Sequence, residues 1–437
     1  MKDKGIIPSY GEMATRENII KELEVIVKDW IKDVGDRQGI TDLSAAIVPY
    51  GSYALKVYTR SSDIDILVVA PECVSMDFDF FVHLSDLVET IPNVTKLRGI
   101  KGAMVPLLKF NVRGIDVDLA CARVKTMIVP RPEILHKQDF CLPIAADARC
   151  RLSLESIKSS WSILKCVGKN REIFVQATRF LKYWTDRRGI SGNTNCYIGG
   201  IHLVVLVAYI CMAYRGKSFA GAISCFFATF SGWSWDTPVL LDEGFIESSS
   251  RNVQMSIQKP GTNTLCSSNV TMMTLRKISS ELYRGYCLTR VLSNCWSSLL
   301  DEFPYEIYHR FIKVKMSVPD GEVDEYLGFI KSRLHVLIRS LEEKGIVCDP
   351  SVIEFRDPPP VGSKDCRDDN RVLLWGIIDK FTVRNGGLIE NDLRGPEQIW
   401  RHNLTVNNGG LRGQVKLDVI PRMVYSSYKK NNIVKRT

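Results

Sequence analysis

Residues 50–66 read YGSYALKVYTRSSDIDI, and the apolar run LVVA continues the stretch from Leu67. The alternation of acidic and apolar residues predicts a buried β-strand that begins near Asp63. Residues i and i+2 of a strand point to the same face, so Asp63 and Asp65 are predicted to lie side by side. The repulsion between two neighbouring carboxylates has to be relieved by positive charge.

A second predicted strand offers more carboxylates. The run IDVDLACA carries Asp116 and Asp118, and the apolar run VPLLKFNV precedes it across a turn at Arg113-Gly114, which is the pattern of a hairpin. If this strand pairs beside the first, two carboxylates from one strand and a third from its neighbour form the usual ligand set for two hard divalent cations.

A Gly-Ser pair, Gly51-Ser52, precedes the acidic strand. Glycine lets backbone N–H groups approach a phosphate closely, and the serine hydroxyl adds a donor. Each motif alone is a weak signal, because acids that alternate along a strand usually form a solvated face. The combination of the Gly-Ser pair, the acidic pair and a third strand carboxylate indicates phosphoryl transfer.

Composition restricts the class of protein. The chain has 437 residues, of which 45% are hydrophobic and 24% charged, which predicts a globular protein of about two to three domains. The most apolar run, from Ile201, suits a buried helix, so no membrane contact is expected. Thirteen cysteines without a CxxC pair predict free thiols, and the six histidines lack zinc-site spacing. A net charge of +9 fits a polyanionic partner.

The order of the predicted elements gives the domain organisation. An amphipathic helix over 15–34 leads into an alternating α/β region, and the segment 152–300 is mostly helical. The remainder predicts a small split-βαβ sheet of the RNA-recognition type. Its predicted elements are strands at 311–318, 351–355, 372–378 and 414–420 and a helix at 324–345.

The stretch YGSYALKVYTRSSDIDILVVAP resembles the signature of the eukaryotic-type poly(A) polymerases, which belong to the DNA polymerase β-like nucleotidyltransferase superfamily. The resemblance continues in the family's order through VPLLKFNVRGIDVDLACAR, TRFLKYWTDRRGI, IGGIHLVVL and FSGWSWDTPVLL, and covers nearly the whole chain. It implies an α+β fold of three domains: an N-terminal helix with a nucleotidyltransferase palm (1–125), a helical nucleotide-pocket domain (126–300) and an RNA-binding, RNA-recognition-like domain (301–437).

The resemblance also implies the site residues. Asp63, Asp65 and Asp118 match the catalytic carboxylates that bind two Mg²⁺ (or Mn²⁺) ions, and Asp116 is interpreted as a supporting neighbour. ATP is the implied substrate. The positions that match the family's nucleotide pocket are Tyr50, Gly51, Ser52, Thr59, Lys182, Ser191, Asn193, Gly200 and Ile201.

Some positions depart from the family pattern. Ser191 stands where the family has a tyrosine that contacts the triphosphate, and Glu155 stands where it has an asparagine. Ala54 and Lys56 alter the stretch after the Gly-Ser pair. The three carboxylates are all present, so these departures bear on nucleotide affinity and adenine preference and not on the chemistry.

The activity implied by the resemblance is template-independent addition of AMP from ATP to RNA 3′ ends, with release of pyrophosphate, as in mRNA polyadenylation. The implied protein is a nuclear monomer, with the cytoplasm as an alternative location and 3′-end processing factors as further partners. A terminal uridylyltransferase, a CCA-adding or oligoadenylate-type enzyme, and a catalytically weak RNA-binding scaffold are the alternatives. The scaffold would be marked by a missing carboxylate.

Basic residues of the C-terminal region are candidates for RNA contact. Lys313, Lys315, Lys331 and Arg333 lie on its predicted strand and helix, and the segment 422–437 has five basic residues and no acid. Binding through these residues would weaken as salt increases. The alternative interpretation of the segment is a solvated basic tail.

Overall fold

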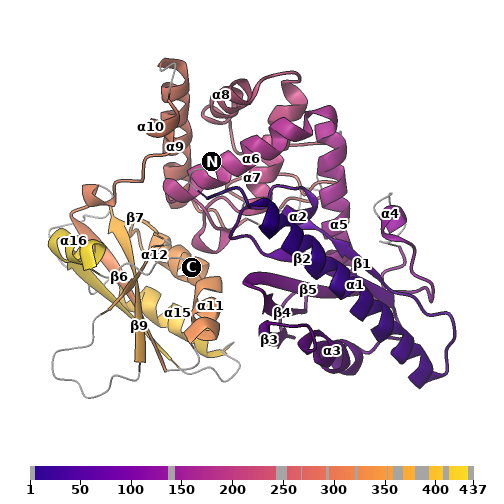
Figure 1. Ribbon diagram of the computed structural model, residues 1–437. Helices are drawn as coiled ribbons and strands as arrows, with labels where there is room; N and C mark the ends of the chain where they lie inside the picture. Colours follow the sequence, from indigo (N-terminus) through magenta and orange to yellow (C-terminus); the bar gives the residue numbers. More distant parts are fainter. Residues whose placement is uncertain are drawn as a thin grey trace.

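The structure is a computed structural model, and it describes residues 5–135, 143–242, 253–266, 268–291, 295–319, 323–351, 353–357, 368–378, 393–406 and 413–431. Figure 1 shows an N-terminal sheet with its helices in indigo and purple and a second sheet in orange and yellow. In this view the central helices, in magenta, lie above the two sheets. The mixed α+β architecture expected from the sequence is therefore confirmed.

The N-terminal sheet contains, within the described residues, strands in the order β1-β2-β5-β4-β3. Strands β2 and β5 are parallel, and the other neighbours are antiparallel. The hairpin between β4 and β5 turns at Arg113 and Gly114, which both have positive φ, as the sequence predicted. The strands span Ala46–Pro49 (β1), Ile64–Pro71 (β2), Ile115–Val124 (β5), Leu107–Val112 (β4) and Val94–Ile100 (β3).

The two faces of this sheet pack against different helices. Apolar residues of one face form a core with α1 (Tyr10–Gln38), the π-helical η1 (Met76–Leu84) and α3 (Ser85–Glu89). The other face packs on α5 (Ala148–Val167). Helix α1 is well defined at its start, because Ser9 and Glu12 form a reciprocal capping box.

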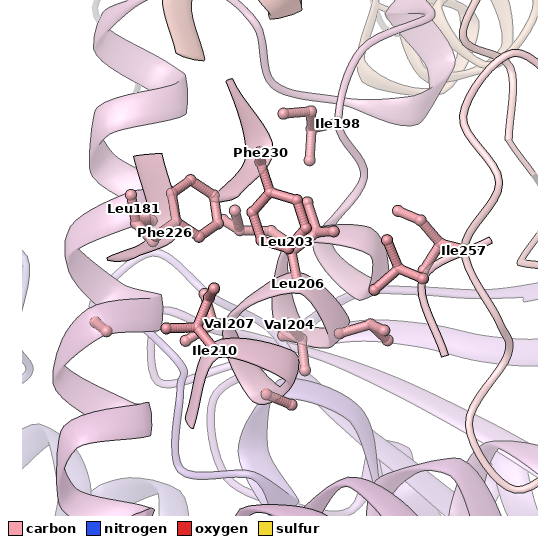
Figure 2. Close-up of a cluster of buried hydrophobic side chains, with 14 of the residues drawn as sticks. Leu181, Ile198, Leu203, Val204, Leu206, Val207, Ile210, Phe226, Phe230 and Ile257 are labelled. Carbon is pink, nitrogen blue, oxygen red and sulfur yellow. The ribbon is translucent and has the colours of Figure 1, made fainter. Parts of the chain in front are cut away.

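The central helices bury a largely apolar cluster (Figure 2), to which α7 contributes residues from nearly its whole circumference. Helix α7 contains the apolar run predicted to be a buried helix. The described helices of this part are α6 (Arg171–Arg187), α7 (Gly200–Ala213), α8 (Phe219–Phe230), α9 (Met272–Val291), α10 (Trp296–Leu299) and the short η2 (Gly168–Asn170) and η3 (Asn193–Asn195). Two further short helices are α2 (Gly51–Ala54) and α4 (Pro132–Leu135).

The C-terminal sheet has the described strand order β10-β6-β9-β7, and β8 also pairs with β9. These pairings are all antiparallel. The strands span Arg310–Pro319 (β6), Cys348–Asp349 (β7), Glu354–Arg356 (β8), Asp368–Ile377 (β9) and Gln414–Pro421 (β10). The helices around it are η4 (Tyr305–Ile307), α11 (Val323–Ser332), α12 (Leu334–Glu343), α15 (Arg394–Val406) and α16 (Arg422–Asn431).

Both faces of the C-terminal sheet are covered. Helices α11, α12 and α15 bury one face, and α16 lies across the other, where Tyr425 stacks on Phe311 at a ring-centroid distance of 4.3 Å. The first part of the basic segment 422–437 is thus a packed helix, and its last residues lie outside the described part. The helix predicted over 324–345 is wrong in one respect, because it is divided at Arg333 into α11 and α12.

No helix in the described part of the chain is long and apolar enough to cross a membrane. The cysteines that the structure describes are all free. The division of the chain at residues 125 and 300 stays a prediction.

A buried ion pair provides a test of the central packing. Arg188 donates to both carboxylate oxygens of Glu281, at 2.7 and 3.0 Å, and both side chains are 5% exposed. Glu281→Ala leaves the guanidinium buried without its carboxylate, which should cost about 3–5 kcal/mol of unfolding free energy. The neighbouring pair of Arg187 with Glu302 is more exposed, so Glu302→Ala should cost about 0–1 kcal/mol. Denaturant unfolding followed by circular dichroism measures both free energies of unfolding. Equal losses of stability in the two variants would contradict a larger contribution from the buried pair of Arg188 and Glu281.

Candidate active site

The three predicted carboxylates lie together. The parallel register of β2 and β5 places Asp65 directly opposite Asp118, and Asp63 precedes β2 with the same side-chain direction as Asp65. One carboxylate oxygen from each of the three lies within 4.8 Å of the others. Within the described residues this is the one group of three or more His, Cys, Asp or Glu side chains arranged to hold a metal ion. The predicted proximity of the three acids is confirmed.

The cluster is electrostatically unfavourable by itself. Burial, followed by the charges of Asp63 and Asp118, raises the pKa of Asp65 to about 7. Burial and the charge of Asp118 likewise raise the pKa of Asp63. Because these shifts come from desolvation and from like charges, a cation placed among the three groups would stabilise their ionised forms.

Lys109 is a site residue that the sequence analysis missed. It lies on β4 directly opposite Asp118, and its Nζ is 2.7 Å from Asp118 Oδ1. The hairpin turn at Arg113-Gly114 would have identified it, because counting outward from that turn along both strands pairs the two residues. Lys109 therefore supplies part of the positive charge that the acidic strand requires.

Gly51 is fitted against the acid cluster. Its φ is +60°, and a Cβ atom at this position would lie 2.6 Å from Asp65 Oδ2. Two hydrogen bonds fix the segment: the Tyr50 amide donates to the Asp65 carbonyl at 3.1 Å, and the Gly51 amide donates to Ser160 Oγ on α5 at 3.1 Å. Gly51 and Ser52 open the short helix α2.

The turn that leads into Asp63 is held by a buried arginine from α1. Arg16 donates to the carbonyls of Arg60 and Ser62, at 3.1 and 2.5 Å, and its guanidinium lies over the ring of Tyr58. Thr59, a predicted nucleotide-pocket residue, lies in this turn and is hydrogen-bonded to Ser62 through its amide and its hydroxyl. The anchoring by Arg16 was not visible in the sequence, because it joins residues far apart in the chain.

Lys182 reaches the same region from the central part of the chain. It lies on α6, and its Nζ donates to the Val57 carbonyl at 3.3 Å. Burial lowers the pKa of Lys182, while the charges of Asp63, Asp186 and Asp65 act in the opposite direction. A lysine on a helix is usually solvated, but this one is half-buried and within electrostatic range of the acid cluster.

The remaining predicted pocket residues gather at the start of α7. Ser191 forms a bridge with Ile198, and the Asn193 side chain accepts a hydrogen bond from the Asn269 amide at 3.0 Å. Gly200 begins α7, and Ile201 is 40% exposed. Within the described part of the chain, no hydrogen bond or ion pair joins these four residues to the acid cluster. Their role in nucleotide binding stays a prediction.

Glu155, which departs from the family pattern, has an ion-pair partner. Glu155 on α5 forms an ion pair with Lys259, and both side chains are largely buried. The carboxylate is therefore neutralised within the chain.

The predicted pocket residue Tyr50 lies close to the acid cluster. Burial and the charge of Asp65 raise the pKa of Tyr50.

Comparison with known families places the chain. A model of the poly(A) polymerase nucleotidyltransferase domain matches residues 1–167, and a model of the poly(A) polymerase central domain matches residues 173–302. The chain is 32% identical over 389 residues to nuclear poly(A) polymerase 3 of Arabidopsis thaliana, covering 86% of this chain and 75% of that protein. It belongs to the poly(A) polymerase family.

Other relatives are longer than the matched region. Nuclear poly(A) polymerase 4 of Arabidopsis thaliana is 30% identical over 422 residues, covering 87% of this chain and 56% of that protein. Poly(A) polymerase pla1 of Schizosaccharomyces pombe is 30% identical over 367 residues, covering 78% of this chain and 64% of that protein. A solved structure of the Cid1 terminal uridylyl transferase covers 68% of this chain at 14% identity and a TM-score of 0.49, a similarity too low to bear on function.

The contact between Gly51 and Asp65 gives a specific prediction. Gly51→Ala introduces a methyl group 2.6 Å from the carboxylate, so we expect it to displace Asp65 and to lower nucleotide incorporation at least about tenfold. Gly39→Ala is the matched control, since Gly39 has a similar φ of +66° but no atom within 4 Å of the added Cβ. Equal activity of the two variants in primer extension would show that the close approach is not needed.

Proposed function

We propose that this protein is a template-independent polynucleotide adenylyltransferase, which transfers AMP from ATP to the 3′ end of RNA and releases pyrophosphate. The observation that carries the proposal is the half-buried cluster of Asp63, Asp65 and Asp118 on the paired strands β2 and β5, in a chain of the poly(A) polymerase family. The catalytic role of each of the three carboxylates is part of the proposal.

The donor set of the cluster fits magnesium or manganese. Both ions prefer carboxylate oxygens completed by water and substrate phosphates, and three carboxylates provide hard oxygen ligands without sulfur or imidazole competitors. Their oxygens lie within 4.8 Å of one another, a spacing that suits ligands shared by two neighbouring cations. Asp63, Asp65 and Asp118 would hold two such ions.

When bound, the two ions neutralise the triphosphate charge and lower the pKa of the RNA 3′-hydroxyl. The protein's own contribution is placement and charge. Asp118 would orient the 3′-hydroxyl and accept its proton, and Lys109 Nζ lies 2.7 Å from the Asp118 carboxylate. Gly51, which has no Cβ atom, lets the Gly51-Ser52 segment approach the Asp65 carboxylate closely, and Lys182 would provide a cation for the triphosphate. Positioning and charge neutralisation then supply most of the acceleration.

Nucleotide recognition would involve residues on both sides of the cluster. We assign Tyr50, Gly51, Ser52 and Thr59 to the N-terminal side of an ATP pocket. Lys182, Ser191, Asn193, Gly200 and Ile201 would form its central side. The start of α7 is consistent with this role, because Gly200 has open space around it and Ile201 is exposed, which leaves room for a base to stack. Adenine preference would follow from the shape of this pocket.

The C-terminal elements would form an RNA-recognition-like domain that holds the RNA. The lysines first considered for this role are already paired: Lys313 and Lys315 lie 3.0 and 3.2 Å from Asp357, and Lys331 pairs with Glu354. Helix α16 covers one sheet face, so RNA contact through that face would require α16 to move. Direct RNA contacts would therefore come from surfaces other than these lysines and the face under α16.

The proposal has four further parts. The domain boundaries lie near 125 and 300, the protein is nuclear, it is a monomer, and it contacts 3′-end processing factors.

Removal of a carboxylate tests the proposal. Asp63→Ala or Asp65→Ala should reduce AMP incorporation at least about 100-fold, because loss of even an outer partner of a metal ligand costs 10–100-fold. The fold should remain, since removing mutually repelling acids relieves strain. Primer extension with radiolabelled nucleotide measures incorporation, and circular dichroism checks the fold. A double variant that extends RNA at the normal rate would contradict the mechanism.

Nucleotide choice separates the alternatives. The same RNA primer incubated with each of the four NTPs should be extended with ATP well above the other three. A preference for UTP would assign the chain to terminal uridylyl transfer, and binding of RNA without any extension would favour the scaffold.

The serine at position 191 gives a further prediction. A neutral hydrogen bond to a phosphate contributes about 0.5–1.5 kcal/mol, so restoring the ring by Ser191→Tyr should lower KM for ATP about threefold to tenfold. The turnover number should change little if the contact is equal in the ground and transition states. Steady-state kinetics of both proteins decides the matter, and a KM that rises or stays level would mean that the pocket has rearranged around serine.

A further inference from the structure

A row of four charged side chains crosses the N-terminal sheet. The strand registers place Asp65 of β2 opposite Asp118 of β5, Asp118 opposite Lys109 of β4, and Lys109 opposite Arg98 of β3. Directly opposed residues of neighbouring strands point to the same face. The row therefore runs from two acids on β2 and β5 to one base on β4 and a second base on the edge strand β3.

The packing of the opposite face of the sheet, against η1, supports the conclusion that Arg98 points to the face that carries the acid cluster. Gly99, the residue after Arg98, faces η1, where an added Cβ would lie 2.9 Å from the ring of Phe81. Leu108, which is opposite Gly99, is fully buried in the same core. Alternation along β3 then turns Arg98 to the face that carries the acid cluster. Figure 1 shows β3 and β4 on the side of the sheet that is turned toward the C-terminal elements in this view.

The two bases differ in their partners. Lys109 is paired with Asp118, whereas Arg98 is partly exposed and has no ion-pair or hydrogen-bond partner among the residues that the structure describes. Like charges directly opposite each other on neighbouring strands are destabilising, and nothing within the described chain offsets the charge of Arg98. Its charge is thus available to an anion that approaches the acid cluster along this face.

The geometry of the reaction identifies the anion. In an in-line displacement the attacking hydroxyl and the leaving pyrophosphate lie on opposite sides of the reacting phosphate. Gly51 approaches Asp65 from the β1 side of the row, and the proposed triphosphate contacts lie there. Arg98 lies on the other side of the acids, about 10 Å or two strand spacings from Asp118. That is the side from which the RNA 3′-hydroxyl must enter.

We propose that Arg98 binds a backbone phosphate of the RNA primer close to its 3′ end, on the face of the sheet that carries the acid cluster, beyond Lys109. This inference rests on the proposed function, because it takes the acid cluster as the place of nucleotidyl transfer. Arg98 acts as a positioning residue: it neutralises one phosphate and aligns the last nucleotides of the strand with Asp118. The contact is to the sugar-phosphate backbone, so it carries no sequence preference.

The test is a comparison of Arg98→Gln with the wild-type protein. We expect KM for the primer to rise about fivefold to tenfold at low salt, while KM for ATP stays within twofold and turnover at saturating primer is nearly preserved. Equilibrium binding of a fluorescent oligoadenylate, measured by anisotropy across a salt series, should lose about 0.7 from the slope of log K against log salt. Arg98→Lys keeps the charge and should retain most of the affinity.

Arg113→Gln is the matched control. Arg113 lies on the same sheet, at the β4–β5 turn, but is paired with Glu22 of α1, so its removal should leave both the primer KM and the salt slope unchanged. If Arg98→Gln raised KM for ATP and not for the primer, the anion would be the triphosphate and the proposal would be wrong. An unchanged salt slope would also overturn it. Failure of the wild-type protein to extend RNA would contradict the proposed function, and the binding series would still decide the role of Arg98.

Discussion

The repulsion among three half-buried carboxylates is the constraint on which the rest of this structure depends. Parallel pairing of β2 with β5 forces Asp65 and Asp118 together, and burial raises the pKa of Asp65 to about 7. Surrounding residues reduce this cost without removing it: Lys109 pairs with Asp118, and Lys182 lies within electrostatic range. A cluster that is held together by the fold and left short of positive charge is suited to bind cations and the phosphates that accompany them.

The fold holds the cluster from several directions. On one side, the buried Arg16 of α1 donates hydrogen bonds to carbonyls of the turn before Asp63. On another side, the Gly51 amide donates a hydrogen bond to Ser160 of α5. Lys182 of α6 donates a hydrogen bond to the Val57 carbonyl. These contacts join the first and second parts of the chain at the site itself. A site held by contacts from several elements suits phosphoryl transfer, in which positioning provides most of the catalysis.

Local patterns were sufficient to predict the centre of the site. Strand parity placed Asp63 beside Asp65, and the Arg113-Gly114 hairpin brought Asp118 onto a neighbouring strand. Strand β3 was not predicted, because VTKLRGI lacks a clear alternation and its residues are mostly solvent-accessible at a sheet edge. The pairing of Lys313 and Lys315 with Asp357 could not be predicted from the sequence either, since it depends on tertiary contacts between distant residues. Role assignments for the pocket at α7 came from the resemblance, and geometry alone does not supply them.

We propose that Asp63, Asp65 and Asp118 together hold the cations for nucleotidyl transfer. Titration with Mn²⁺ in the presence of a non-hydrolysable ATP analogue, followed by electron paramagnetic resonance of the free ion, tests it without relying on activity. We expect two bound ions per chain for the wild-type protein and a loss of at least one of them in Asp118→Asn. Equal stoichiometry and affinity in the two proteins would contradict it.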